Sequence, residues 1–144
     1  MCKNMSIQYT YYTKFFLKNK TSYSKWLSKV VESEGCRVGE IVFAFFNDED
    51  LKLLNNKHLG RDYYTDVISF NDSKKKLING NIAISVDRVK ENAKTFNVSF
   101  ENEMLRVMVH GVLHFLGYND TNPKEKKEML IAENNKIKMF HVER

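Results

Sequence analysis

The segment from His110 to Asp120, HGVLHFLGYND, carries the side chains best suited to chemistry. His110 and His114 are four residues apart, so on a helix both imidazoles lie on one face, one turn apart. Two imidazole nitrogens at this spacing can bind one metal ion at about 2.0–2.1 Å. Gly117 is suited to end the helix, and Asp120 follows where a returning loop can supply a third ligand. The pattern H-x-x-x-H-x-x-G-x-x-D therefore predicts a metal site made of His110, His114 and Asp120.

Three protein ligands leave a fourth position for water, which is typical of a catalytic rather than a structural zinc site. Zinc lowers the pKa of such a water, which then becomes a nucleophile near neutral pH. The alternative is a buried helix whose histidines are hydrogen-bonded in the core, and the histidine pair alone does not decide between the two. Zinc peptidases carry H-E-x-x-H, with the glutamate as general base. Here that position is Gly111, which argues against proteolysis and leaves hydrolysis of another bond open.

A long helix over residues 99–117 must position the two histidines. Ser99 is a suitable N-cap, and Glu101 and Glu103 fall in the first turn, where negative charge is favourable. Apolar residues are spread around more than one face of this helix, which predicts that it is mostly buried.

The remaining elements follow from hydrophobic periodicity and from turn residues. We expect strands over 6–13, 36–47, 65–70 and 79–86, with the last two paired as a hairpin. We expect helices over 21–35, 48–60, 87–97 and 122–140, with Thr21 or Ser22 as the N-cap of the first. The chain, residues 1–144, is thus predicted to form a single α+β domain, in which about five helices pack on a small mixed four-stranded sheet.

Composition narrows the class of protein. The formal net charge of +5 suits a polyanionic partner such as RNA. The two cysteines, Cys2 and Cys36, have no metal-binding or redox spacing, which favours a reduced, cytoplasmic setting. The sequence contains neither an apolar run of membrane-spanning length nor a signal-peptide pattern, so we expect no membrane association.

Three blocks of the sequence resemble the YbeY family of metal-dependent endoribonucleases. HGVLHFLGY is similar to the family signature H-G-x-L-H-L-x-G-Y-D-H. Residues 54–70, LNNKHLGRDYYTDVISF, are similar to L-N-x-x-Y-R-x-K-D-x-x-T-D-V-L-S-F, and residues 80–85, GNIAIS, to G-D-I-x-I-S. The resemblance implies an α+β domain with a metalloprotease-like helix and one zinc ion. It also implies cleavage of single-stranded RNA in the maturation of ribosomal RNA and in ribosome quality control, with RNA and the ribosome as partners.

The resemblance assigns His110 and His114 as the first two metal ligands and places Asp120 where the family has a third histidine. Aspartate is an accepted zinc ligand. Its negative charge is expected to make a bound water less acidic than three histidines would. Asn119 stands where the family has aspartate and is a competing oxygen ligand, but a poorer one because it is neutral.

Other positions depart from the family pattern. Leu59 replaces the arginine of the Y-R pair, and His58 replaces its tyrosine. Arg61 occupies the following lysine position and can take over a phosphate contact, since its planar fork suits phosphate oxygens. Asn81 replaces the aspartate of G-D-I. The loss of the arginine keeps open a non-catalytic alternative, a ribosome-assembly or RNA-binding factor with a structural zinc.

Further polar residues receive less specific predictions. Thr65, Asp66 and Ser69 are expected to make hydrogen bonds where their strand begins, rather than to contact substrate. His141 is expected on the surface, and the lysines of the hairpin turn, Lys74, Lys75 and Lys76, in solvent. Five other lysines can form part of a basic face, although the sequence does not show that they converge: Lys14, Lys18, Lys20, Lys25 and Lys29.

Overall fold

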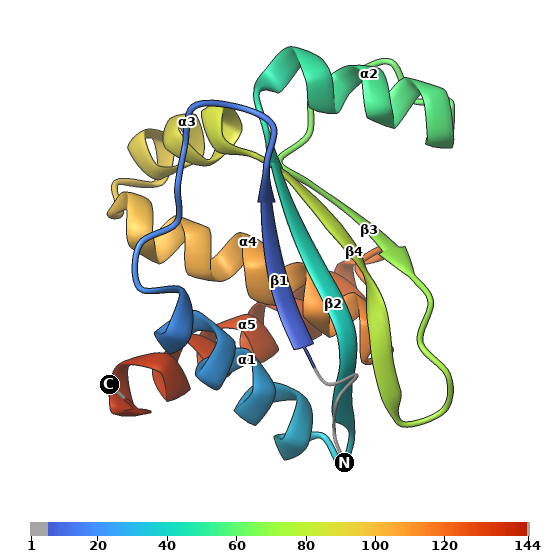
Figure 1. Cartoon of the computed structure of the whole chain (residues 1–144), viewed down its shortest axis with the longest axis vertical. Helices are drawn as coiled ribbons and strands as arrows, with labels where there is room; N and C mark the ends of the chain where they lie inside the picture. The colour runs from blue at the N-terminus through green and yellow to red at the C-terminus, as the bar shows by residue number, and fades with distance from the viewer. Residues whose placement is uncertain (1–5, 144) are drawn as a thin grey trace.

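The computed structural model describes residues 6–143 as a four-stranded mixed sheet with five helices (Figure 1). The elements in chain order are β1 (Ser6–Tyr11), α1 (Lys20–Ser33), β2 (Arg37–Phe46), α2 (Asp48–Leu59), β3 (Val67–Asn71), β4 (Leu77–Ser85), α3 (Val86–Phe96), α4 (Phe100–Phe115) and α5 (Pro123–Glu143). The strand order is β1-β2-β4-β3; β1, β2 and β4 run parallel, and β3 pairs with β4 as an antiparallel hairpin. The predicted α+β class and the predicted hairpin are both confirmed.

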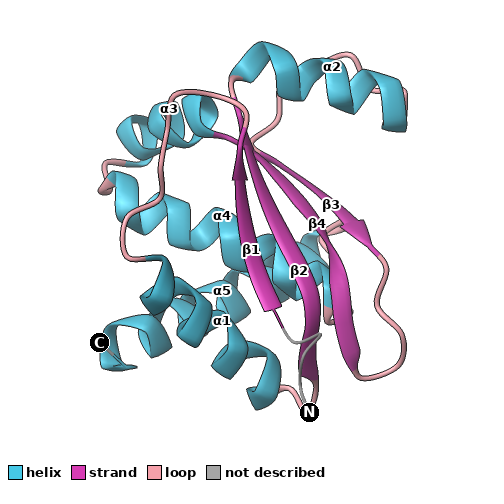
Figure 2. Cartoon of the chain, viewed as in Figure 1, coloured by secondary structure: helices cyan, strands magenta, loops and turns pink. Residues whose placement is uncertain are grey.

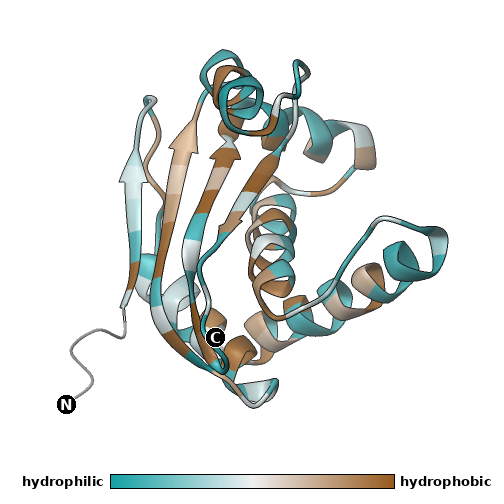
Figure 3. Cartoon of the chain, turned by 90° about the vertical axis from the view of Figure 1, so that its right-hand side faces the viewer, coloured by the Kyte–Doolittle hydropathy of each residue, from teal (hydrophilic) through white to brown (hydrophobic). Residues whose placement is uncertain are grey.

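The helices are divided unequally between the two faces of the sheet. One face packs against α4, with α1, α3 and α5 beyond and beside it, whereas α2 lies at one end of the sheet (Figure 2). Strand alternation points every second side chain of β2 into the helical layer, so Ile41, Phe43 and Phe45 are fully buried. Figure 3 shows hydrophobic segments along the central strands and along α4, where this core lies.

Helix α4 is the buried helix that the sequence predicts, with ten of its residues buried. The Ser99 side chain accepts a hydrogen bond from the Asn102 backbone N–H at 3.0 Å, which confirms the predicted N-cap. The chain turns at Gly117, whose φ of +104° strains residues that carry a side chain. This turn returns the chain toward the histidine-bearing face of α4.

The predicted start of the first helix is wrong. The N-cap of α1 is Asn19 in the left-handed conformation, and its carbonyl accepts hydrogen bonds from the backbone N–H groups of Ser22 and Tyr23. Thr21 and Ser22 therefore lie inside the first turn. Asparagine tolerates positive φ better than most residues, so the helix can begin at this upstream position.

Two further observations concern the described part of the chain. Cys36 is a free thiol, and Cys2 lies outside the described residues. Among residues 6–143, no helix combines the length and the apolar character that crossing a membrane would require.

Candidate metal centre

The end of α4 and the loop after it bring His110, His114 and Asp120 together. The two histidine Nε2 atoms are 3.0 Å apart, and Asp120 Oδ2 lies 3.3 Å from His110 Nε2 and 3.6 Å from His114 Nε2. A tetrahedral ion bound at about 2.0–2.1 Å separates neighbouring ligand atoms by about 3.3–3.4 Å. The three side chains therefore form a group able to hold one metal ion.

Hydrogen bonds at the other ring nitrogens orient both imidazoles. His114 Nδ1 donates to the carbonyl of Tyr118 at 3.0 Å, and His110 Nδ1 donates to Glu133 Oε2 at 2.6 Å. In a neutral imidazole with a proton on Nδ1, Nε2 carries a free lone pair. Two such lone pairs and one carboxylate oxygen converge on one point. These three electron-rich atoms repel one another, and a bound cation would relieve this repulsion.

The two histidines differ in proton affinity. Burial lowers the pKa of His110, but the hydrogen bond and charge of Glu133, with the charges of Asp120 and Asp66, outweigh it and raise the pKa. Burial and the charge of His110 lower the pKa of His114. A proton at this site therefore resides on His110 first, and a metal ion has to displace it.

Glu133, on α5, is the important residue that the sequence analysis missed. It is 6% exposed, and besides His110 it contacts Arg106, whose Nη1 donates to Glu133 Oε1 at 2.7 Å. The second guanidinium nitrogen of Arg106 donates to Asn134 Oδ1 at 2.7 Å. A feature of the sequence that indicates a role for Glu133 is its position on the apolar face of the last helix, between Ala132 and Ile137, where a charged residue needs a partner.

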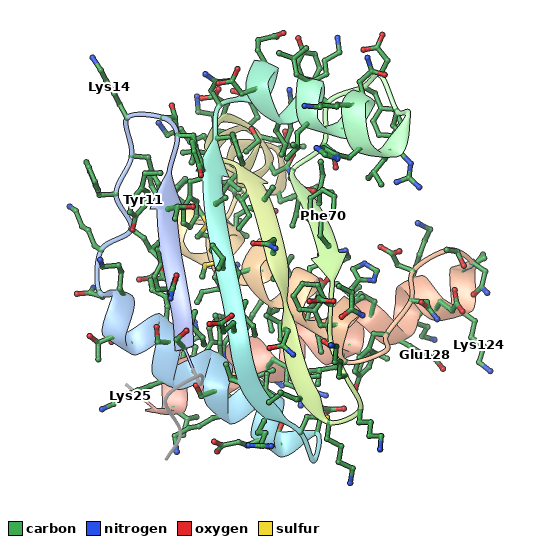
Figure 4. All side chains as sticks on the ribbon, turned by 45° about the vertical axis from the view of Figure 1, so that its right-hand side comes forward. Tyr11, Lys14, Lys25, Phe70, Lys124 and Glu128 are labelled. Atoms are coloured by element: carbon green, nitrogen blue, oxygen red, sulfur yellow. The ribbon has the colours of Figure 1, made fainter. Side chains whose placement is uncertain are left out.

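A cavity of about 460 Å³ opens beside the three ligand atoms, between α2, β3 and α4. Arg61 and Leu59 both line it, so Arg61 rather than Leu59 brings positive charge to the site. Asn119 instead lines a separate depression with Glu125 and Glu128, so the structure brings Asp120 and not Asn119 to the histidines. Figure 4 shows this side of the molecule, with Phe70 on β3 and Lys124 and Glu128 on α5.

Of the three residues predicted to make hydrogen bonds at the start of β3, Thr65 and Asp66 do so. The hydroxyl of Thr65 lies 3.5 Å from the carbonyl of Val67, and Asn92 Nδ2 donates to Asp66 Oδ2 at 3.1 Å. Thr65, Asp66 and Ser69 all belong to the cavity lining. Burial raises the pKa of Asp66, which the charge of His110 opposes. His141 is exposed, as are Lys74, Lys75 and Lys76, as predicted.

Packing explains why glycine follows the first histidine. A Cβ at Gly111 would lie 2.9 Å from two carbon atoms of Ile82 on β4 and 3.1 Å from Ser69 Oγ on β3. The glycine thus lets α4 approach the sheet closely, and this approach leaves no room for the glutamate of a peptidase helix.

Replacing Gly111 with glutamate, which would create H-E-x-x-H, is expected to destabilise the fold by at least about 3 kcal/mol, because it overpacks the helix–sheet contact and buries a charge. Gly111→Ala should cost about 1 kcal/mol, since the higher helix propensity of alanine offsets part of the clash. Urea unfolding of the metal-free proteins measures both. A Gly111→Glu variant as stable as the wild type would contradict this packing argument.

The free energy of unfolding is expected to depend on pH because Glu103, on α4, is buried. Glu103 is 3% exposed; burial, aided by the charge of Asp66 and opposed by Arg106, raises its pKa from 4.5 to about 7. The folded state therefore binds more protons than the unfolded state, and this group lowers stability as pH rises from about 4.5 to about 7. Glu103→Gln is expected to stabilise the metal-free protein by about 2 kcal/mol at pH 8 and by little near pH 4.

Urea unfolding at the two pH values, in the presence of a chelator, measures this difference. Glu128→Gln, at an exposed position of α5, is the matched control and should leave the pH dependence unchanged. An equal gain for Glu103→Gln at both pH values would show that burial does not hold a proton on Glu103.

Comparisons with known proteins agree with this geometry. A family model described as Endoribonuclease YbeY matches residues 8–141. A Flavobacterium johnsoniae protein named Endoribonuclease YbeY is 45% identical, over 95% of this chain and 99% of the relative. A protein of the same name from Christiangramia forsetii is 43% identical, over 90% of each chain.

A solved structure has the same fold. The solution structure of TM1509 from Thermotoga maritima aligns with a TM-score of 0.69 and 27% identity, over 96% of this chain and 91% of that one. The sequence similarity extends over nearly the whole chain, far beyond the histidine motif. The protein therefore belongs to the YbeY family of endoribonucleases.

Proposed function

We propose that this protein is a zinc-dependent endoribonuclease that cleaves single-stranded RNA, acting in the cytoplasm on ribosomal RNA precursors in maturation and in ribosome quality control. The observation that carries the proposal is the convergence of two histidine nitrogens and one carboxylate oxygen beside an open cavity, in a chain that belongs to a family of endoribonucleases.

In the proposed site, His110, His114 and Asp120 hold one zinc ion. When bound, zinc supplies a Lewis acid that stabilises negative charge on the scissile phosphate or lowers the pKa of a water molecule. The donor set, two borderline nitrogens and one oxygen, suits zinc and leaves one position for substrate or water. This open position, next to the cavity, favours a catalytic over a structural role for the ion.

The other residues of the cavity bind and orient the RNA in this proposal. Arg61 is exposed at the cavity, where its guanidinium can bind a phosphate in a bidentate manner. Because such contacts release counterions from the RNA, affinity should fall as salt rises. Glu133 holds the His110 ring, so that Nε2 faces the ion.

The test compares cleavage of one RNA oligonucleotide by wild-type, chelator-treated and zinc-restored protein, with the RNA single-stranded and annealed to its complement. We expect the wild-type and restored proteins to cut the single strand, the treated protein to be inactive, and the duplex to resist. His114→Ala, purified identically, controls for contamination. Equal cleavage by this variant and the wild type would refute the proposed activity.

A further inference from the structure

The excess of basic over acidic side chains lies in the first 31 residues, far along the chain from the metal centre at residues 110–120. Residues 1–31 contain six lysines and no acidic residue, which leaves 17 of the 23 basic side chains against all 18 acidic ones in the rest of the chain. The basic excess therefore belongs to the N-terminal segment, and the part of the chain that builds the metal centre is nearly neutral. A polyanion is attracted first to the N-terminal segment.

Two lysines of this segment, Lys14 and Lys25, lie on the opposite side of the molecule from the cavity. Lys14 lies on the loop 12–19 and Lys25 on α1, both on the β1 side in Figure 4, whereas Phe70 and Lys124 lie on the other side. The strand order places β1 at one edge of the sheet and β3, which lines the cavity, at the other. We call residues 13–19 together with the exposed face of α1 the α1 surface.

The same loop exposes the aromatic ring of Phe16 between Lys14 and Lys18. Tyr12, at the start of the loop, is also exposed, but its ring stacks on Phe46, which packs with Leu51 of α2 on the face of the sheet opposite to α1, so Tyr12 does not belong to the α1 surface. Phe16 is 76% exposed, and its ring is 4.9 Å from Tyr11. The exposed Phe16 ring is thus held in place by a second aromatic ring, that of Tyr11. Pre-positioned aromatic faces beside lysines are the combination that binds single-stranded nucleic acid, through base stacking and phosphate contacts.

The N-terminus of α1 carries positive charge, which destabilises the helix. Its first turn contains no acidic residue, whereas the first turns of α2, α3 and α4 contain one to three. Lys20 lies in this turn instead, and Lys18 directly precedes the N-cap Asn19, so both lie at the positive end of the helix dipole, where cations are unfavourable. Further along the helix, Lys25 and Lys29 line a depression with the hydroxyl side chains of Ser22 and Ser28, and the lining includes one carboxylate, that of Glu32. An anionic ligand would turn this unfavourable cluster of charge into a favourable one.

We propose that the α1 surface is a second RNA-binding site, which holds a single-stranded segment of the substrate at a distance from the cleavage site. Lys14, Lys18 and Lys25 contact phosphates, and Phe16 stacks on a base. The proposal rests on the proposed function only in taking RNA as the polyanion. It adds a docking site to the one at the cavity, so the length of the RNA should influence its affinity.

The test measures binding of a fluorescent single-stranded RNA of about 20 nucleotides, made uncleavable by 2′-O-methyl groups, over a range of salt concentrations. The test variant is Lys14→Glu/Lys18→Glu/Lys25→Glu. The control is Lys74→Glu/Lys75→Glu/Lys76→Glu, which changes the net charge equally at exposed positions of the β3–β4 turn. We expect the test variant to bind at least about tenfold more weakly and to lose about 2 units of salt slope, as expected for three lost phosphate contacts. The control should bind within about twofold of the wild type.

Phe16→Ala separates the stacking contribution from the charge. It should weaken RNA binding severalfold with an unchanged salt slope, since a phenyl ring releases no counterions. Equal losses in the two triple variants would mean that only net charge matters, and wild-type affinity in the test variant would mean that RNA does not bind this surface; either result overturns the proposal. A wild type that binds this RNA through the α1 surface but cleaves no RNA refutes the proposed function alone.

Discussion

Replacing His114 with alanine is expected to remove the metal ion from the protein and to abolish RNA cleavage. Within residues 6–143, His114 Nε2 is one of three candidate ligand atoms that lie close enough together to hold one ion, and its removal leaves one nitrogen and one carboxylate oxygen. Loss of a residue that merely supports a ligand already costs about 10–100-fold in metal affinity. Loss of the ligand itself should exceed this range.

Zinc content, measured by elemental analysis, and zinc affinity, measured by competition with a chromophoric chelator, test this prediction. The wild type should hold about one ion per chain and the variant almost none. His141→Ala is the matched control, because His141 is an exposed histidine on α5. A His114→Ala protein that retains zinc at full stoichiometry would show that the ion is bound elsewhere.

The second large effect is expected at Glu133. Its carboxylate accepts a hydrogen bond from His110 Nδ1 and pairs with Arg106, so it fixes both the tautomer and the orientation of the His110 ring. Glu133→Ala should weaken zinc binding by about 10–100-fold. Glu133→Gln should weaken it less, since an amide oxygen still accepts the hydrogen bond from His110 but carries no charge for Arg106.

Glu128→Ala, at an exposed position of the same helix, is the control and should bind zinc as the wild type does. Urea unfolding in the presence of chelator separates loss of zinc binding from loss of stability, because breaking the pair with Arg106 also destabilises the fold. Zinc affinity that is unchanged in both Glu133 variants would mean that the hydrogen bond at Nδ1 does not support the metal centre.

Much of the fold is predictable from local pattern. Helix α4 is recognisable from its capping serine, its apolar spread and its terminating glycine, each of which acts within a few residues of its own position. The N-terminus of α1 is not predictable in this way, because Asn19, Thr21 and Ser22 are all acceptable N-caps and the local sequence does not rank them decisively. Errors of this size do not move any residue of the candidate metal centre.

The sequence by itself determined that His110 and His114 share one face of a helix, since residues four apart lie on the same face of any α-helix. Together with the family resemblance it also pointed to Asp120, and the loop after Gly117 does return Asp120 Oδ2 to within 3.6 Å of both nitrogens. The tertiary structure alone decided the rest. Glu133 reaches His110 because α5 packs against α4, and Gly111 meets Ile82 because α4 packs against the sheet. Both contacts join residues far apart in the chain, and local pattern does not specify which long-range neighbours will meet.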